Sequence, residues 1–309
     1  MRSLRIGSRG SKLALCQAGH IRERLLYEAT VPIEIIIIKT SGDQFSATPA
    51  SQIGGKGIFI KEIEEALLDG RVDLAVHSMK DVPTDLGADL EIAAVTRRED
   101  PRDCLIARIG GTLESLPHGA RVGTGSIRRQ SQLRHLRPDL DLRDLRGNVD
   151  TRLRKLDAGE YDAIVLAKAG LDRLGFTERI TQVISPEILL PAVGQGALGI
   201  EIMASRKNEF PFLDALNDRD TMICVRAERA LLAALEGGCQ VSLGAWGCIE
   251  REQLVLDACV LSADGSEHLR RRATGAVNDP GALGRSLAQD LLVSGAGRIL
   301  RLAGRSIGD

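Results

Sequence analysis

The run Ile33–Lys39 carries five isoleucines in seven residues. β-Branched side chains favour extended backbone, and a run this continuous is typical of a strand buried within a sheet rather than one at a surface. No apolar run in the chain approaches the roughly 20 residues that a membrane-spanning helix needs. The chain is therefore expected to fold around buried β-structure and to have no membrane partner.

Strand and helix patterns alternate on either side of this run over the first two-thirds of the chain. Expected strands are Leu4–Ser8, Val72–Met79, Ile92–Val95, Ala120–Gly123, Leu140–Leu145 and Tyr161–Ala167, and expected helices begin after Ser11 and span Phe59–Leu68, Ile127–Leu136 and Val149–Leu156. A charged stretch, Arg97–Asp103, and the segment Pro191–Gly196 interrupt the pattern. Such alternation predicts two α/β domains, and the strand Leu198–Ile202 is expected to return to the sheet of the first.

The pattern changes from Asp220 onward. A helical run up to Leu235 is followed by three strand-like segments and one final helix at about Ala282–Leu302, which is an α+β arrangement. A length of 309 residues accommodates two or three domains. We therefore predict one domain from residues 1–97 with 197–214, a second from 102–192 and a small third from 219–309.

Composition and cysteine spacing exclude several classes of protein. Formal net charge is −1, with 43% hydrophobic and 27% charged residues, which indicates a globular protein without the overall basic character of a nucleic-acid binder. The N-terminus has no hydrophobic signal region, which favours a cytoplasmic location. The six cysteines form neither a C-x-x-C pair nor a zinc-spaced set with histidine, so we expect reduced thiols and no metal.

Arginine is concentrated in one part of the chain. Residues 121–154 contain nine arginines and four aspartates but no lysine, glutamate or aromatic residue. Several of these arginines lie where a strand meets a helix, which is where α/β sheets bind ligands and where helix N-termini favour anions. Arg9 repeats the arrangement at the first strand–helix junction. Because a P-loop and stacking aromatics are both missing, the pattern favours a cleft for a small molecule with several carboxylates, with a solvated basic face as the alternative.

A second polar cluster, His77–Asp81, lies at the end of an expected strand. Asp81 adjoins Lys80, and a carboxylate among cations stays ionised and can move protons or stabilise a cation. His77 and Ser78 point to opposite faces of a strand, and no G-x-S-x-G motif is present. His77 is therefore expected to be a packed structural residue rather than the base of a hydrolase.

Cys239 follows a helix that ends in Gly237-Gly238, because glycine readily adopts the left-handed conformation at a helix C-terminus. A thiol on such a turn is accessible, which suits a reactive group as well as an ordinary loop cysteine. A longer loop, Ser41–Gly57, is rich in glycine, serine and threonine. A loop of that length in a compact domain is usually functional, and it is predicted to be a lid.

Six separated motifs, in order along essentially the whole chain, resemble the hydroxymethylbilane synthase (porphobilinogen deaminase) family. They are Arg9–Ala14 with Gln17, His77–Pro83, Gly123–Arg129, Arg146–Asn148, Pro191–Gly196 and Leu235–Cys239. The resemblance implies two type II periplasmic-binding-protein-like α/β domains with an active-site cleft between them, plus a small α+β domain that carries the cysteine. It also implies a cytoplasmic monomer with no nucleic-acid partner.

The activity implied by the resemblance is that of a transferase in tetrapyrrole (haem) biosynthesis. Four porphobilinogen molecules are condensed head to tail, with loss of ammonia, onto a dipyrromethane cofactor joined by a thioether to Cys239, and hydroxymethylbilane is then released. Asp81 is the implied catalytic carboxylate. The implied cofactor-binding residues are Cys239, Ser78, Lys80, Asp81, Thr124, Ser126, Arg128, Arg129, Arg152 and Arg173, and the implied substrate-binding residues are Arg9, Ser11, Gln17 and Arg146.

Two positions depart from the family pattern. Ser242 stands where proline is usual, and it could loosen the loop after Cys239. Lys168 stands where a small residue is usual, and it could alter the wall of the cleft. Two other classes of function stay open from the residues alone, namely a two-lobed anion receptor without chemistry and a thiol hydrolase that uses Cys239 with His77.

Overall fold

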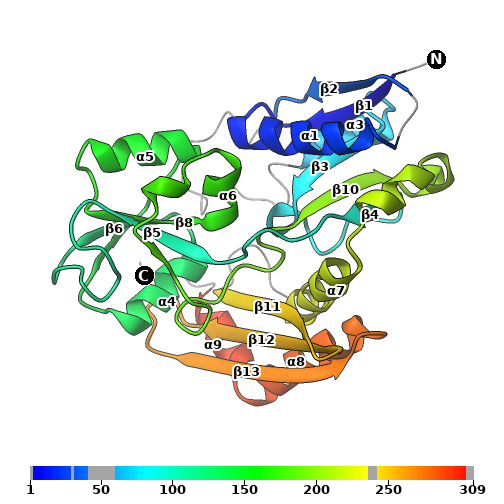
Figure 1. Cartoon of the computed structure of the whole chain (residues 1–309). Coiled ribbons are helices and arrows are strands. Elements are labelled where there is room, and N and C mark those ends of the chain that lie inside the picture. The colour runs from blue at the N-terminus through cyan, green and yellow to red at the C-terminus, as the bar shows by residue number, and fades with distance from the viewer. Residues whose placement is uncertain (1–2, 29–30, 41–59, 236–241, 304–309) are drawn as a thin grey trace. The chain divides into compact units, whose positions relative to one another are not determined.

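A computed structural model of the chain describes residues 3–28, 31–40, 60–235 and 242–303 (Figure 1). The chain forms two compact units, Met1–Glu99 with Gly196–Met222 and Asp100–Gln195 with Ile223–Asp309. We describe each unit by itself, and the three-domain division stays a prediction. Within the described ranges, no helix is long and apolar enough to cross a membrane.

The first unit is built on a five-stranded sheet with the order β2-β1-β3-β10-β4, here called the first sheet. Its strands are β1 (Leu4–Ser8), β2 (Ile33–Ile37), β3 (Leu74–Ser78), β4 (Leu90–Val95) and β10 (Leu198–Met203). β1 is parallel to β2 and β3, whereas β10 is antiparallel to β3 and β4. The predicted return of Leu198–Ile202 to this sheet is thus confirmed.

Helices cover both faces of the first sheet. α1 (Lys12–Leu25) shares a buried apolar cluster with Val76, and α3 (Lys61–Leu68) shares another with Ala75. Since neighbouring residues of a strand point to opposite faces, the two helices lie on opposite sides of β3. Short 3₁₀ helices complete the unit, namely η1 (Met79–Asp81), η3 (Ala204–Glu209) and η4 (Pro211–Leu216).

The expectation that Ile33–Lys39 is a buried strand is wrong. Its strand, β2, lies at the edge of the first sheet, where its single neighbour among the described strands is β1. Ile37 is consequently 56% exposed. β-Branched residues suit any pleated, half-buried surface. Their density therefore predicted a strand correctly, but it did not distinguish an edge strand from a central, buried one.

The second unit contains a five-stranded sheet with the order β7-β6-β8-β5-β9, here called the second sheet. Its strands are β5 (Asp103–Ala107), β6 (Arg121–Gly123), β7 (Asp141–Arg143), β8 (Ala163–Ala167) and β9 (Gln182–Val183), and its helices are α4 (Ile127–Leu136), α5 (Val149–Asp157), α6 (Lys168–Arg173) and the 3₁₀ helix η2 (Thr177–Arg179). β6 is parallel to β7 and β8, while β5 is antiparallel to β8. The arrangement matches that of the first sheet strand for strand, as expected for paired α/β domains.

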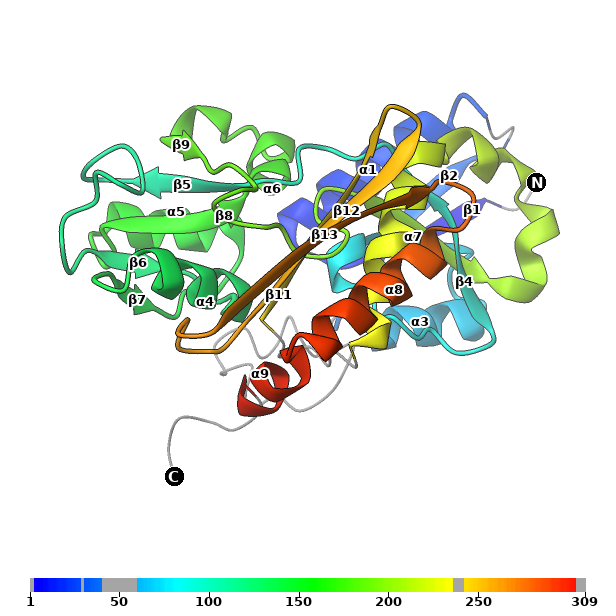
Figure 2. The same ribbon diagram turned by 90° about the horizontal axis from the view of Figure 1, so that it is seen from below.

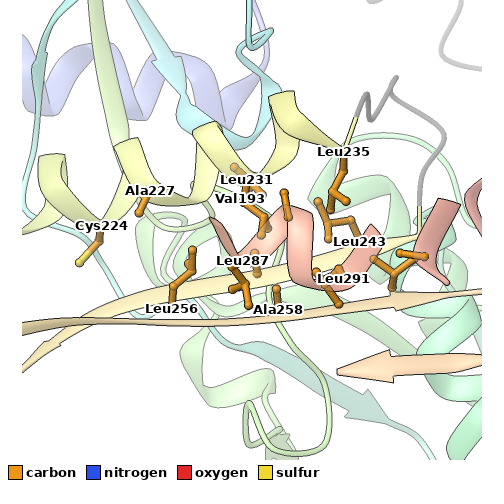
Figure 3. Close-up of a cluster of buried hydrophobic side chains, with 14 of the residues drawn as sticks. Val193, Cys224, Ala227, Leu231, Leu235, Leu243, Leu256, Ala258, Leu287 and Leu291 are labelled. Carbon is orange, nitrogen blue, oxygen red and sulfur yellow. The ribbon is translucent and has the colours of Figure 1, made fainter. Parts of the chain in front are cut away.

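The second unit also holds a three-stranded antiparallel sheet, here called the C-terminal sheet. Its strands are β11 (Leu243–Glu250), β12 (Gln253–Leu261) and β13 (His268–Ala276), and its helices are α7 (Arg219–Ala234), which begins in the first unit, α8 (Pro280–Val293) and α9 (Ala296–Ala303). Figure 3 shows Leu231 of α7 and Leu287 of α8 pointing into one apolar cluster with Leu256 of the sheet. α7 and α8 pack so closely that a Cβ at Gly284 would lie only 2.3 Å from the carbonyl oxygen of Ala227.

The single final helix predicted at Ala282–Leu302 is in fact two helices, α8 and α9 (Figure 2). Gly295 lies between them with φ of +103°. Such a value is accessible to glycine and strained for other residues, so the backbone turns there instead of continuing the helix. Because the apolar pattern continues on both sides, with Leu291 and Ile299 both buried, periodicity alone did not reveal the break.

Candidate functional site

The polar residues predicted for the first unit gather at one edge of the first sheet. Arg9 and Ser11 follow β1, and Ser78, Lys80 and Asp81 end or follow β3. The two strands are parallel, so their carboxyl ends lie at the same edge, which is where open α/β sheets bind ligands. The structure thus places these five residues where the sequence predicted.

Two of these residues are fixed by hydrogen bonds that the fold provides. Ser11 caps α1 and accepts from the backbone amide of Ala14 at 3.3 Å, as side-chain oxygens at helix N-caps do. Gln17, which is 5% exposed, donates through Nε2 to Ser78 Oγ at 3.0 Å. Gln17, which is predicted to bind the substrate, therefore contacts Ser78, which is predicted to bind the cofactor.

Asp81 lies in the 3₁₀ turn η1 together with Lys80, and both side chains are exposed. Between β3 and this pair is Met79, which is 2% exposed and packs against β10. A Cβ at Gly199 would lie 2.3 Å from the sulfur of Met79, so glycine is required there for the turn to dock. The buried methionine anchors the turn and leaves its carboxylate accessible to a ligand.

His77 is buried, as predicted. Its hydrogen-bond partner is a carboxylate that we did not predict. Its Nε2 lies 2.9 Å from Oε2 of Glu201 on β10, and the two side chains are 4% and 0% exposed. Glu201 stands inside an apolar strand pattern, which gave no reason to single it out. An imidazole held in this way has no exposed surface with which to serve a thiol, so the geometry does not favour a hydrolase.

The second sheet gathers its predicted residues in the same manner. Thr124 and Ser126 follow β6 and lead into α4, where Ser126 is the N-cap and accepts from the amide of Arg129 at 3.4 Å. Arg146 follows β7, Arg152 is on α5, and Arg173 ends α6, which follows β8. Since β6, β7 and β8 are parallel, these groups also lie toward one edge of a sheet.

Arg128 and Arg129 are buried around a carboxylate that the sequence analysis missed. Asp103 on β5 is 0% exposed, and both arginines are 5% exposed. One oxygen of Asp103 accepts from Arg128 Nη1 at 2.7 Å, and the other accepts from Nε and Nη2 of Arg129 at 3.0 and 2.7 Å. Gln195 adds a further hydrogen bond to Asp103 at 2.9 Å. Asp103 lay in the stretch that we interpreted as a charged crossover. It could have been identified as a buried carboxylate only if the residues that begin at Asp103 had been predicted to form a buried strand.

This buried network carries an unbalanced charge. Burial by itself would raise the pKa of Asp103, but the two guanidinium groups hold it below the usual range of a carboxyl. Arginine does not deprotonate in proteins, so two positive charges face one negative charge and one positive charge remains. Nε of Arg128 is buried and has no hydrogen-bond partner among the described residues. These features fit a ligand that brings carboxylates.

The other arginines of the second sheet are more exposed and differ in their surroundings. Arg146 pairs with Asp144 at 2.6 Å on the surface, and Arg152 donates through Nε to the carbonyl of Gly147 at 2.7 Å. Lys168, one of the two departures from the family pattern, pairs with Asp172 at 2.6 Å along α6, the helix that carries Arg173. Its charge is thus matched within its own helix.

Among the described cysteines, two are unsuited to nucleophilic chemistry. Burial raises the pKa of Cys104 to about 12 and that of Cys259 to about 11, so neither is a thiolate near neutral pH. Cys239, the predicted site of attachment, lies outside the described residues, as does the predicted lid Ser41–Gly57.

Together these features define a class of protein: a chain with two matched α/β sheets whose strand ends bear hydroxyl groups, a carboxylate and buried arginines suited to a small polycarboxylate ligand.

Comparison with known proteins is more specific. Residues 4–209 match the family model described as "Porphobilinogen deaminase, dipyromethane cofactor binding domain", and residues 222–293 match "Porphobilinogen deaminase, C-terminal domain". Porphobilinogen deaminase from Syntrophobacter fumaroxidans is 48% identical over 302 residues, which is 97% of each chain. That from Roseiflexus castenholzii is 50% identical, covering 96% of this chain and 98% of the relative.

The chain belongs to the porphobilinogen deaminase family. It is accordingly a transferase of tetrapyrrole biosynthesis, a hydroxymethylbilane synthase, with a dipyrromethane cofactor-binding domain. The alternative of a receptor without chemistry is thereby overturned.

More distant likeness is found among solved structures. The periplasmic VFT2 domain of BvgS from Bordetella pertussis aligns with a TM-score of 0.43 at 13% identity, covering 69% of this chain and 85% of that domain. The sulphonate-binding protein SsuA from Escherichia coli aligns with a TM-score of 0.41 at 17% identity, covering 76% and 71%. At such scores the likeness adds nothing to the fold described above.

Proposed function

We propose that the dipyrromethane cofactor is joined by a thioether to Cys239 and that its carboxylates are held mainly by the edge of the second sheet. Arg128 and Arg129 supply charge, Thr124 and Ser126 supply hydroxyl groups, and Arg152 and Arg173 add further cations. Ser78 and Lys80 on the first sheet complete the set. When bound, the cofactor supplies the pyrrole carbon that is extended.

The single observation that carries this assignment is the unbalanced charge around Asp103. A buried arginine without a full set of partners is costly, whereas a ligand carboxylate placed beside it gains charge-assisted hydrogen bonds. Porphobilinogen-derived chains carry an acetate and a propionate on every ring. The two arginines thus form a receptor for acidic side chains that Asp103 orients without neutralising.

We assign the incoming porphobilinogen to the edge of the first sheet. Arg9, Ser11 and Gln17 would hold its acidic side chains there, and Arg146 would contribute a further cation. Asp81 is the catalytic carboxylate in this proposal. Loss of ammonia leaves positive charge on a pyrrole ring, and an exposed carboxylate can both stabilise that charge and accept the proton lost in coupling.

Intact mass of the denatured chain tests the attachment. Protein from cells that make porphobilinogen should exceed its sequence mass by two linked pyrrole units, and Cys239→Ala should remove the excess. Cys248→Ala is the matched control, since Cys248 is a half-exposed thiol in the same unit and should keep it. A wild-type chain at its plain sequence mass would refute the proposal.

We further propose that the enzyme acts as a cytoplasmic monomer without nucleic acid. The net charge of −1 gives no electrostatic attraction to nucleic acid overall. Sedimentation at micromolar concentration should give the mass of one chain, and a concentration-dependent dimer would contradict the proposal.

A further inference from the structure

Gln132 is a buried polar residue of α4 that has no part in the site described above. It is 3% exposed, and it lies four residues after Arg128, so the two side chains share one face of the helix. Oε1 of Gln132 accepts from the amide of Leu190 at 2.8 Å, and Nε2 donates to the carbonyl of the same residue at 3.1 Å. The side chain thus holds Leu190, in the segment between β9 and β10, by both of its backbone groups.

The carbonyl of Leu190 also accepts from Arg128. Nη1 of Arg128 donates to this carbonyl at 2.6 Å and to Oδ2 of Asp103 at 2.7 Å. A carbonyl oxygen has two lone pairs, and Gln132 and Arg128 fill both. Nη1 has two protons, and Asp103 and Leu190 accept both. The guanidinium group is therefore fixed on its Nη1 side.

The other edge of Arg128 is the one left for a ligand. It is formed by Nε and Nη2, and Nε is buried without a hydrogen-bond partner among the described residues. Arg129 already uses the same edge on Asp103. An edge of this kind can donate two parallel hydrogen bonds to one carboxylate. Its direction depends on where Nη1 is anchored, and hence on the carbonyl of Leu190.

Leu190 is held by the C-terminal sheet as well. Its side chain is 0% exposed, and the next carbonyl, that of Pro191, accepts from the amide of Ala245 on β11 at 2.9 Å. α4 is tied to the same end of β11, because the buried hydroxyl groups of Ser131 and Ser242 are hydrogen-bonded to each other. Ser242, which we expected to loosen the chain, is thus itself a fixed residue. The carbonyl that orients Arg128 is accordingly a rigid acceptor.

We propose that Gln132 is a positioning residue for cofactor binding. By holding both backbone groups of Leu190, it fixes the carbonyl that orients Arg128 and so presents the Nε–Nη2 edge to a ligand carboxylate. The proposal rests on the cofactor-binding function proposed above for Arg128. A neutral amide suits this position, since an acidic residue would cancel the excess positive charge around Asp103 that attracts the ligand.

Loading of the cofactor is the quantity to measure. Full-length chain from cells that cannot make porphobilinogen is mixed with increasing concentrations of porphobilinogen for a fixed time. Mass spectrometry of the denatured chain then gives the fraction that has gained mass, and the midpoint of this curve is the half-loading concentration. Gln132→Met keeps the size of the side chain and removes both bonds to Leu190. We expect it to raise the half-loading concentration about threefold to tenfold, as the loss of a hydrogen bond would.

Gln132→Glu tests the same position by its charge. The carboxylate keeps the acceptor for the amide of Leu190, cannot donate to the carbonyl, and adds a negative charge beside Arg128. It should therefore compete with the ligand, and the half-loading concentration should rise at least as far as in Gln132→Met. The two substitutions perturb folding in different ways, so either one supports the measurement if the other yields no folded chain.

Gln182→Met is the matched control. Gln182 lies on β9 of the same sheet and also accepts from a backbone amide, that of Leu113 at 2.7 Å, but it contacts neither Arg128 nor Leu190 among the hydrogen bonds described. Its replacement should lower the melting temperature and leave the half-loading concentration unchanged. In an Arg128→Leu background, Gln132→Met should add no further rise, because the guanidinium group that it positions is gone.

Wild-type half-loading in a folded Gln132→Met or Gln132→Glu chain would overturn the proposal, as would an equal rise in Gln182→Met. A full additional rise in the Arg128→Leu background would do the same, since it would show that Gln132 acts through stability alone. If the wild-type chain gains no mass, or if Arg128→Leu loads as readily as the wild type, then the cofactor function proposed for Arg128 has itself failed. The two failures are therefore distinguishable.

Discussion

The first and second sheets share a strand order but bury different charges. In each, an antiparallel strand lies beside the third parallel strand, β10 beside β3 and β5 beside β8. Each antiparallel strand carries a carboxylate that is 0% exposed, Glu201 in the first sheet and Asp103 in the second. Glu201 meets the single imidazole of His77, whereas Asp103 meets the two guanidinium groups of Arg128 and Arg129.

The difference shows how one scaffold can serve two electrostatic roles. An imidazole can be neutral or charged, so the pairing of one imidazole with the one carboxylate of Glu201 leaves no positive charge in excess. A guanidinium remains charged at every accessible pH, so Asp103 leaves one positive charge for a ligand to balance. The first sheet offers an exposed carboxylate, Asp81, beside the cations Arg9 and Lys80, whereas the second sheet offers the buried cations Arg128 and Arg129.

The largest effect that would sharpen this comparison is expected at Asp81. Asp81→Asn keeps the size and removes the one exposed carboxylate of the turn η1. We expect a loss of about 10²–10⁴-fold in turnover, the usual contribution of general acid–base help, with cofactor content unchanged. Asp81→Glu keeps the charge but displaces it and should retain a small part of the activity.

Single-turnover release of ammonia from cofactor-loaded protein is the measurement. The matched control is Asp85→Asn, a nearby exposed aspartate whose side chain accepts from the amide of Gly87 at 3.0 Å in its own turn. It should release ammonia at the wild-type rate. A near wild-type rate in Asp81→Asn would remove Asp81 from the mechanism.

Much of the fold and part of the site could be predicted from the sequence. The alternation of strands, the α+β end of the chain and the strand-end positions of Arg9, Ser78 and Arg128 follow from local patterns. The buried carboxylates could not be predicted, because Asp103 and Glu201 read as solvent-facing charges until their arginine and histidine partners are placed beside them. These contacts bridge separate elements, 25 residues apart for Asp103 with Arg128 and 124 residues apart for Glu201 with His77.

The second prediction compares the two buried carboxylates directly. Asp103→Asn leaves two buried guanidinium groups without a counter-charge, and removing one partner of a buried pair typically costs about 3–5 kcal/mol of unfolding free energy. Glu201→Gln in the first sheet should cost less, since the imidazole left behind can be neutral. Denaturant unfolding of the two variants at pH 7 measures the difference, and equal costs would break the comparison.

The same pair predicts a pH dependence. Since the pKa of Asp103 is held below its usual value, its stabilisation is fully present above the unfolded-state pKa of about 3.9 and is lost as the pH falls through the lower folded-state value. The gap between wild type and Asp103→Asn should therefore be constant from pH 7 to 5 and narrow only in strong acid. A gap that closes near pH 6 would assign the effect to another group.

The third prediction separates the arginines of the two sheets. Arg128→Leu removes a charge-assisted contact worth about 1.5–3 kcal/mol, so it should reduce the cofactor content of purified protein. Arg9→Leu should leave cofactor content intact and mainly slow substrate addition. Arg134→Leu is the matched control on α4, because Arg134 bonds only to the carbonyl of Ala263 among the contacts described, and it should keep its cofactor.

Intact mass gives the cofactor content of each variant, and single-turnover assays give substrate addition. Full cofactor in Arg128→Leu would place the anion site elsewhere in the molecule. Loss of cofactor in Arg9→Leu would show that the two sheets do not divide their roles in this way.

The smallest effect concerns the surroundings of Glu201. Glu64 lies in the first turn of α3, and its pKa is raised, chiefly by burial and then by the charge of Glu201, with His77 acting in the opposite direction. A raised pKa means that the charged form is disfavoured in the folded state, so Glu64→Gln should increase the unfolding free energy at pH 7 by a few tenths of a kcal/mol, roughly the range of surface substitutions. The gain should shrink as the pH falls through the raised folded-state pKa and vanish below the unfolded-state value of about 4.3, where wild-type Glu64 is neutral in both states.

Glu65→Gln is the control, because Glu65 pairs weakly with Lys61 at 3.9 Å on the surface and its loss should leave stability unchanged or slightly lower. Chemical denaturation at pH 7 and pH 4 measures both variants. If Glu64→Gln destabilised the protein at pH 7, the buried environment of the first sheet would tolerate a second negative charge, and the electrostatic contrast with the second sheet would lose its basis.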